Sequence, residues 1–180
     1  MSKHTLRNGS ALFLVAAVTL LAGCAAAAKP DAMVPERITP SHKSSADVSI
    51  AVSGGKETSS MGASQISSDA FAKALADSIE QSGLFAKVSA AGARYKLAAF
   101  IGKVDQPMLG FSMTVKMEVS YTLTDTQSTT TLWTKNIASE HTAKAGEAFA
   151  GAARLRLADE GAAKDNIHQA IDAIATLNLP

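Results

Sequence analysis

Apolar and polar residues alternate without a break from Phe111 to Leu123. A period of two puts the two sets on opposite faces of a β-strand, so this segment predicts a strand with one buried and one solvated face. Turn-forming residues follow at 125–130, and the segment 132–142 again carries apolar residues on one face. The two segments together predict an antiparallel pair of strands.

Two shorter segments, 47–52 and 95–102, show the same period. The alternating apolar residues are Val48, Ile50 and Val52 in the first segment and Tyr95, Leu97, Ala99 and Ile101 in the second. Both segments therefore predict strands.

A helix is predicted between these two strands, from Ser67 to Gly83. Ser67 is a favourable N-cap, and Ile66 and Phe71 hold the positions of a hydrophobic staple before and after it. Gly83 supplies a left-handed stop. Apolar residues recur at helical spacing within the segment, which indicates that one face packs on a core; they are Phe71, Ala74, Leu75 and Ile79.

A second helix is predicted over residues 146–177. Its apolar face consists of Phe149, Ala152, Ala153, Ala163, Ile167, Ala170, Ile171 and Ile174. Strands and helices in this order predict an α+β fold in two layers, with a largely antiparallel sheet of four to five strands and two helices packed on one face.

Two charged residues, Arg156 and Glu160, fall on the apolar face of this second helix. Burying charges is costly unless they pair and form further hydrogen bonds. One interpretation is that Gly161 breaks or kinks the helix and turns the pair outward. The other is a semi-buried polar cluster, which Arg154 or Asn166 joins, that fixes the domain or meets a partner.

The amino-terminus has the layout of a secretory signal, with basic residues before an apolar run at 11–21. The run is too short to span a bilayer, which takes about 20 apolar residues. It ends in Leu21-Ala22-Gly23-Cys24, which resembles the lipobox of bacterial lipoproteins. An ordinary signal peptide in which Cys24 is incidental is the alternative.

The resemblance implies cleavage between Gly23 and Cys24 and fatty acylation of Cys24, palmitate being a typical acyl group. Cys24 is the only cysteine in the chain, so no internal disulfide competes for its thiol. Several acyl chains on one residue give stable membrane anchoring. Ala25, where other lipoproteins carry Asp, resembles proteins sent to the outer membrane, so we expect a domain that faces the periplasm.

Three segments follow from this organisation: a signal peptide over 1–23, a lipidated cysteine and tether over 24–46, and a single α+β periplasmic domain over 47–180. The segment 24–46 carries Pro30, Pro35 and Pro40, few large apolar residues and no periodicity. Such a composition is typical of a flexible tether.

Composition excludes some functions. The net charge is only +1 and the basic residues are scattered, so no surface for a nucleic-acid backbone is expected. The histidines that follow the signal segment are His42, His141 and His168, and none has a second ligand at metal spacing. No nucleophile motif is present. We therefore expect no metal, no cofactor and no enzymatic activity.

One turn is unusually apolar for a connection between strands. Met108, Leu109 and Phe111 lie in the segment Gln106–Phe111, where polar residues would be expected. These three residues are a candidate surface for lipid or for a partner. The alternative is that the loop folds onto its own core.

A further resemblance lies around Ser82-Gly83-Leu84-Phe85, at a predicted helix end, with Tyr95 and Leu97 opening the next strand. This arrangement is similar to small periplasmic domains of envelope lipoproteins, among them auxiliary subunits of lipid-transport ABC systems. Those domains often carry an acid where this chain has Arg94.

These observations predict a non-enzymatic accessory or binding module of an envelope assembly or transport system. Its expected partners are the membrane, through the lipid anchor, and another envelope protein. Two alternatives remain open at this stage. One is a binder of lipid or another small apolar ligand, which needs a cavity, and the other is a hydrolase without a recognised motif.

Overall fold

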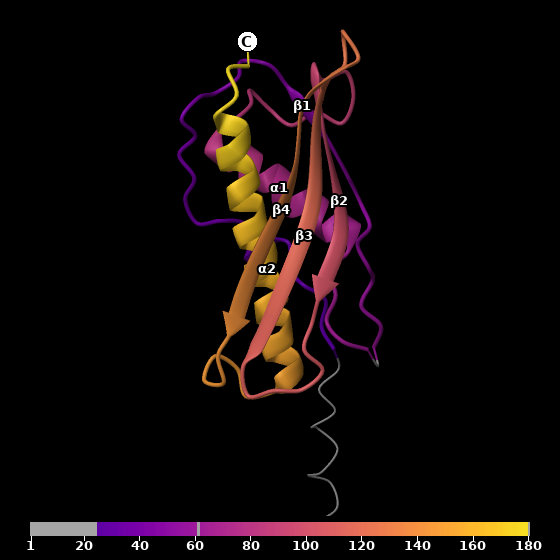
Figure 1. Cartoon of the computed structure of the whole chain (residues 1–180), viewed down its shortest axis with the longest axis vertical. Helices are drawn as coiled ribbons and strands as arrows, with labels where there is room; N and C mark the ends of the chain where they lie inside the picture. Colours follow the sequence, from indigo (N-terminus) through magenta and orange to yellow (C-terminus); the bar gives the residue numbers. More distant parts are fainter. Residues whose placement is uncertain (1–24, 61, 180) are drawn as a thin grey trace, which may run out of the picture.

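The computed structural model describes residues 25–60 and 62–179, which form one sheet with two helices on one of its faces (Figure 1). The predicted α+β class with its two layers is confirmed. The elements in chain order are η1 (Asp31–Met33), β1 (Val48–Ser53), α1 (Ser68–Ser82), β2 (Tyr95–Asp105), β3 (Met113–Asp125), β4 (Thr130–Ala143) and α2 (Gly151–Ala175).

The sheet has four strands in the order β1-β2-β3-β4. β1 and β2 run parallel because α1 connects them, whereas the two later pairs are antiparallel. Helix α2 packs against β3 and β4, and α1 packs against β1. No described residue forms a layer on the opposite face of the sheet, and the hydrophobic core lies between the sheet and the helices.

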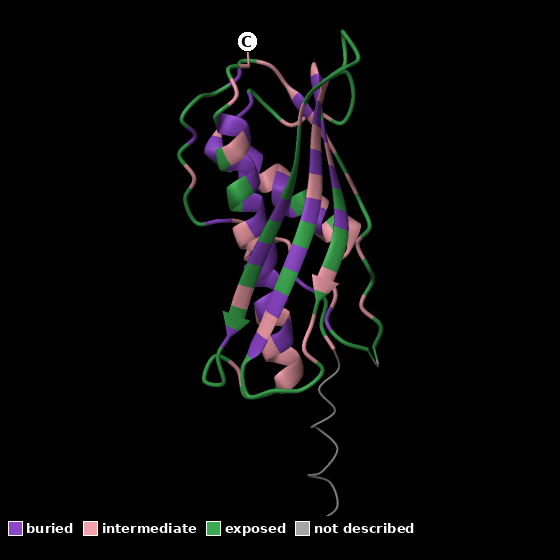
Figure 2. Ribbon diagram, in the orientation of Figure 1, coloured by how far each residue is buried: buried purple, intermediate pink, exposed green. Residues whose placement is uncertain are grey.

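The alternation predicted for the third strand is confirmed from Met113 onward, and it is visible as banding along β3 (Figure 2). The inward residues of this strand are Met113, Val115, Met117, Val119, Tyr121 and Leu123, all of which are buried. Phe111 does not belong to this set, because the strand begins at Met113 and Phe111 lies in the preceding loop.

Helix α1 has the predicted caps at both ends. The Ser67 hydroxyl accepts a hydrogen bond from the Ala70 N–H at 3.1 Å, and Gly83 ends the helix with a left-handed φ of 64°. Ile66 and Phe71, the predicted staple, are both buried. Local capping chemistry therefore determines where this helix begins and ends.

Helix α2 continues without interruption through Gly161, so the interpretation that Gly161 breaks or kinks it is wrong. A side chain at position 161 would collide with the ring of His141, which comes from β4. The glycine therefore serves close packing of the helix on the edge strand. Phe149, which was predicted to lie on the apolar face of the helix, precedes Gly151 and is exposed.

Residues 25–46 pack along the two helices, and we call them the N-terminal strap. The prediction of a flexible tether is wrong for these residues. Met33, in η1, is fully buried and contributes to the main core, and η1 contacts both α1 and α2. Backbone and hydroxyl groups supply further contacts, such as the hydrogen bond from Ser41 Oγ to the Ala175 carbonyl at 2.8 Å. The strap has no periodic apolar pattern, and one buried methionine and a few polar contacts hold it against the helices instead.

The signal peptide over 1–23 and the predicted cleavage and lipidation at Gly23 and Cys24 lie outside the described residues. Within the described part of the chain, no helix has the length and apolar character needed to cross a bilayer.

Candidate functional site

Four large apolar side chains project into solvent at one end of the molecule. Their exposed fractions are 96% for Met108, 90% for Leu109, 89% for Phe111 and 97% for Phe149. We call these four residues the apolar tip. The first three were predicted as a candidate surface, and the alternative that their loop folds onto its own core is wrong.

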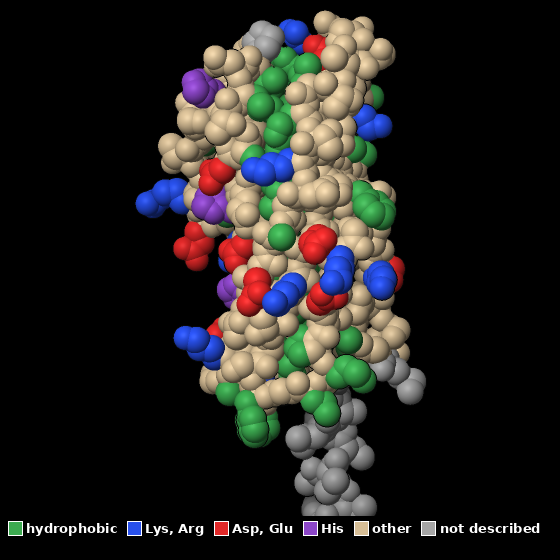
Figure 3. Space-filling view, viewed as in Figure 1, with side chains coloured by type: hydrophobic (Ala, Val, Ile, Leu, Met, Phe, Trp, Pro, Cys, Tyr) green, Lys and Arg blue, Asp and Glu red, His purple; other side chains and the backbone are tan. Residues whose placement is uncertain are grey.

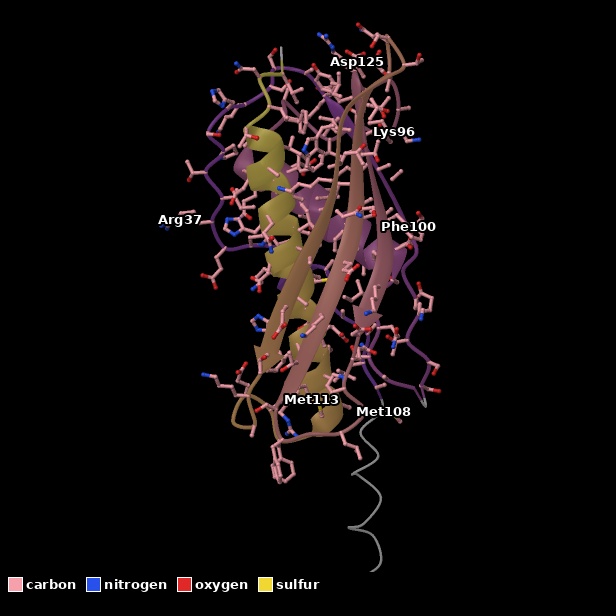
Figure 4. The ribbon with its side chains drawn as sticks, in the orientation of Figure 1. Arg37, Lys96, Phe100, Met108, Met113 and Asp125 are labelled. Carbon is pink, nitrogen blue, oxygen red and sulfur yellow. The ribbon has the colours of Figure 1, made fainter. Side chains whose placement is uncertain are left out.

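The apolar tip is built from two connections that meet at the same end of the sheet. Residues 106–112 join β2 to β3, and residues 144–150 join β4 to α2 (Figure 1). Met108 lies at this end together with Met113, whereas Asp125 marks the opposite end (Figure 4). Because β3 spans the length of the sheet, the tip is as far from the 125–130 turn as the fold allows.

Arg154 joins the two connections. One guanidinium nitrogen, Nη1, donates to the carbonyls of Ala148 at 2.7 Å and Phe149 at 2.9 Å, and Nη2 donates to the Gly110 carbonyl at 3.5 Å. Hydrogen bonds from a charged donor are stronger than neutral ones. Arg154 therefore holds the two apolar loops side by side and does not belong to the polar cluster that the sequence suggested.

Gln106 fixes the base of the 106–112 loop. Its side-chain nitrogen donates to Asp159 Oδ1 and to the Ser64 carbonyl, each at 2.7 Å, and its side-chain oxygen accepts from Gln65 Nε2 at 3.0 Å. These bonds connect the β2–β3 loop, the loop before α1 and helix α2. The outward position of the apolar tip thus rests on a buried polar network.

Asp159 is fully buried, and its burial raises the pKa of the carboxyl to about 6. The hydrogen bond from Gln106 and the nearby Ser64 side chain lower the pKa, while the neighbouring charge of Glu160 adds to the increase. A carboxyl in a low-dielectric environment holds its proton more tightly than one in water. Asp159 is closed off from solvent, so its position suits a structural role in the network.

The remaining residues of the predicted polar cluster separate into two groups. Glu160 is buried and accepts from Arg156 Nη1 at 3.4 Å and from the Lys29 backbone N–H of the strap at 3.0 Å. The interpretation that the Arg156–Glu160 pair turns outward is therefore wrong. The hydrogen bond from the strap stabilises the buried Glu160 carboxylate, whose burial would be costly with Arg156 as its only partner.

Asn166 belongs to a different group, deeper in the core. Its amide nitrogen donates to the Ile137 carbonyl and to Ser139 Oγ, at 2.9 and 3.1 Å, and its oxygen accepts from the Tyr121 hydroxyl at 2.8 Å. Burial raises the pKa of Tyr121 well above its usual range. The group joins α2 to β3 and β4, so Asn166 has a structural role.

Sequence reasoning missed Asp159 and Gln106. Helical spacing did carry a signal for Asp159, since positions 159, 163, 166 and 170 share one face of α2 and all four residues are buried. No comparable signal existed for Gln106, because its partners come from loops distant in the sequence.

Each of the three histidines within the described residues contacts a different neighbour. His42 contacts the Ala175 carbonyl, His141 contacts Asp165 and His168 contacts Asp172. Among residues 25–60 and 62–179, no three His, Cys, Asp or Glu side chains gather closely enough to hold a metal ion.

The uncovered face of the sheet is mainly polar. Cross-strand contacts on it include Lys116 with Glu140 at 3.3 Å and Ser120 with Asn136 at 2.6 Å. Phe100 of β2 interrupts this face and is 53% exposed. It borders a shallow hollow of about 220 Å³ that Lys96, Ala98, Ser120 and Thr122 also line.

On the face shown in Figure 3, Lys, Arg, Asp and Glu side chains form a belt across the lower half, and hydrophobic side chains gather beneath it at the lower end as well as above it. Each apolar side chain of this size contributes about 1.5–3 kcal/mol when it is transferred fully out of water. An end surface of this kind is therefore suited to contact with an apolar phase or partner.

No protein-family model matches the chain, and no curated protein sequence matches it. Solved structures do share its fold. One is protein XCC0632 from Xanthomonas campestris, which carries the family description DUF330, at a TM-score of 0.57 and 11% identity over 78% of this chain and 88% of that one. Another is a candidate lipoprotein from Caulobacter crescentus CB15, at 0.51 and 14% over 72% and 88%.

A third similar structure is the hypothetical protein CT253 from Chlamydia trachomatis, with a TM-score of 0.51 and 9% identity over 72% of this chain and 98% of that one. At these identities the likeness concerns the fold. The sheet with two helices on one face is therefore an arrangement found in several bacterial proteins.

Proposed function

We propose that the protein is a lipid-anchored accessory protein of the bacterial envelope, which faces the periplasm from the outer membrane and binds another envelope protein without catalysing a reaction. The observation that carries the proposal is the lipobox-like Leu21–Cys24, which stands directly before a domain whose strap is hydrogen-bonded from Ala28 onward. The similar fold of a candidate lipoprotein supports the proposal.

Anchoring is tested by mass spectrometry of the amino-terminal peptide of the mature protein. The expected result is a chain that begins at Cys24 and carries a diacylglyceryl group and an amide-linked acyl chain. A Cys24→Ser variant should leave the membrane fraction. An unmodified Cys24, or a Cys24→Ser protein that still fractionates with membranes as tightly as the parent, would contradict the anchor.

The uncovered sheet face around Phe100 is the proposed surface for the envelope partner. A half-exposed aromatic side chain beside a hollow, on an otherwise polar face, has the character of an anchor residue in protein interfaces. A photo-crosslinking phenylalanine analogue at position 100, in intact cells, should give one discrete protein adduct. The same analogue at Gln169, exposed on α2, is the matched control and should give none. Equal patterns at the two positions would reject this surface.

Neither alternative function has a specific observation in its favour. A binder of small apolar ligands needs an enclosed cavity, commonly of about 300–1,000 Å³, yet the inward Met113 and Met117 are packed in the core. Two hollows among the described residues measure about 170 and 220 Å³, which is below this range. For a hydrolase, a carboxyl whose pKa is raised is that of Asp159, which no substrate reaches because it is fully buried.

A further inference from the structure

We infer that the apolar tip is a second membrane contact, in which Met108, Leu109, Phe111 and Phe149 enter the lipid surface and hold the domain upright on the bilayer. The inference builds on the proposed function, because the lipid on Cys24 determines which end of the domain meets the membrane. It adds an orientation and a binding surface that anchoring alone does not supply.

The strap begins at the same end of the domain as the apolar tip. The Ala28 N–H donates to the Gln65 carbonyl at 3.2 Å, and Gln65 in turn bonds to Gln106, which opens the 106–112 loop. Figure 1 shows the first described residues near the end of β2 that leads into this loop. The chain therefore leaves the anchor and joins the domain beside the tip.

Chain length allows the anchor and the tip to reach one plane. Lys29 is bonded to Glu160, nine positions after the first residue of α2, and nine helical residues rise about 14 Å. Cys24 precedes Lys29 by five positions, and five residues span at most about 17 Å. Acyl chains on Cys24 and the side chains of the tip can thus enter the same bilayer surface.

The composition of the tip favours lipid over an electrostatic partner. The segment 106–112 contains no charged residue, and the connection 144–150 carries one cation and one anion, Lys144 and Glu147. Arg154, the cation that joins the two loops, is engaged with three backbone carbonyls, and the Glu147 carboxylate accepts from the backbone N–H of Lys144 in the adjoining turn. Binding of an uncharged apolar surface depends on buried area and little on salt. The clamp by Arg154 keeps the loops in place before they meet the membrane.

The test places a tryptophan at the tip of the lipidated protein. Trp133, the only native tryptophan, is replaced by Phe, and Phe149→Trp supplies the reporter. The protein is reconstituted into phosphatidylcholine vesicles with brominated acyl chains, which quench tryptophan on contact. Gln127→Trp, in the turn at the opposite end, is the matched control. We expect a blue-shifted, quenched emission for Phe149→Trp and an unquenched emission for Gln127→Trp.

A second measurement removes the anchor. The mature chain with Cys24→Ser is added to the same vesicles, and its partitioning is compared with that of a Met108→Ser/Leu109→Ser/Phe111→Ser variant. We expect a loss of about 100-fold or more, since each fully transferred side chain changes the equilibrium by roughly tenfold to a hundredfold. Phe100→Ser, an exposed apolar residue away from the tip, should leave partitioning unchanged, as should high salt.

The outcomes separate this inference from the proposed function. Lipidated protein with an unquenched Phe149→Trp overturns the membrane contact and leaves the anchor in place. Unmodified Cys24 overturns the anchor. Partitioning of the Cys24→Ser chain then tests, without the anchor, whether the tip binds lipid. The reporter could also be blue-shifted but unquenched, with a mass in solution that corresponds to more than one chain. That result would show that the tip mediates contact between copies of the chain, and it overturns the lipid contact.

Discussion

Gln106 donates a hydrogen bond to the carboxylate of Asp159 across 2.7 Å, from the loop after β2 to the middle of helix α2. The same nitrogen also reaches the Ser64 carbonyl, in the loop that precedes α1. Three segments distant in the sequence are thus held by one amide. The position of the apolar tip depends on this bond because residues 106–112 leave the sheet at Gln106.

Replacing Asp159 by asparagine should remove a pH dependence of stability. The pKa of Asp159 is raised from 3.8 to about 6 in the folded protein, so its stabilising contribution is complete below pH 4 and is lost as the pH rises through 6. At pH 7, Asp159→Asn should be more stable than the parent by up to about 3 kcal/mol. Near pH 4 the two should be equal. Urea unfolding across this pH range measures the difference.

The control for this experiment is Asp172→Asn, which changes an exposed carboxylate on the same helix. It should keep the dependence of the parent between pH 4 and pH 6. A parallel pH profile for the parent and Asp159→Asn would show that Asp159 ionises normally.

Arg154→Ala should loosen both loops of the tip at once. It removes the donor to Ala148, Phe149 and Gly110, and hydrogen bonds to a charged group are each worth about 1.5–3 kcal/mol when broken. We expect faster amide hydrogen exchange in segments 107–112 and 144–150, with little change in the sheet. Lys144→Ala, an exposed cation in the same turn, is the control and should leave exchange unaltered. Unchanged exchange in Arg154→Ala would show that Arg154 does not hold the two loops together.

Gly161→Ala should destabilise the protein, although the same change in an exposed helix stabilises by about 1 kcal/mol. The added methyl group meets the His141 ring, and overpacking of this kind costs about 1–3 kcal/mol. In the double variant Gly161→Ala/His141→Ala the loss should disappear or reverse. A double-mutant cycle by thermal or urea unfolding measures this coupling, and additive effects would contradict it.

Met33→Ala tests whether the strap is part of the fold. Truncating a buried methionine costs about 2–5 kcal/mol, and Met33 is fully buried beside both helices. Met108→Ala makes the same chemical change at a residue that is 96% exposed and should alter stability by less than about 0.5 kcal/mol. Similar urea midpoints for the two variants would show that the strap is a flexible tether, as its composition suggested, and not part of the fold.

Local patterns predicted the regular elements well. Alternation located β3 and β4, and the cap at Ser67 with the stop at Gly83 bounded α1 within one residue. These features are encoded by neighbouring residues, whose effect on the backbone does not depend on the rest of the fold.

The features that sequence patterns did not predict all involve contacts between distant segments. Packing of Met33 needs both helices to be in place, and the role of Gly161 is apparent only once β4 brings His141 beside it. Met108, Leu109 and Phe111 were singled out by their residue types, yet their exposure depends on Gln106, Asp159 and Arg154. Such contacts leave no periodic signal along the chain.

The course of the strap has a mechanical consequence. It is fastened near the middle of α2 through Glu160 and at the carboxyl end of α2 through the Ala175 carbonyl, and Met33 lies between these attachment points in the sequence. A pull exerted on the amino-terminus would act first on the bonds around Lys29 and then on Met33, before it strained any strand. The sheet would keep its register under tension that had already begun to peel the strap from the helices.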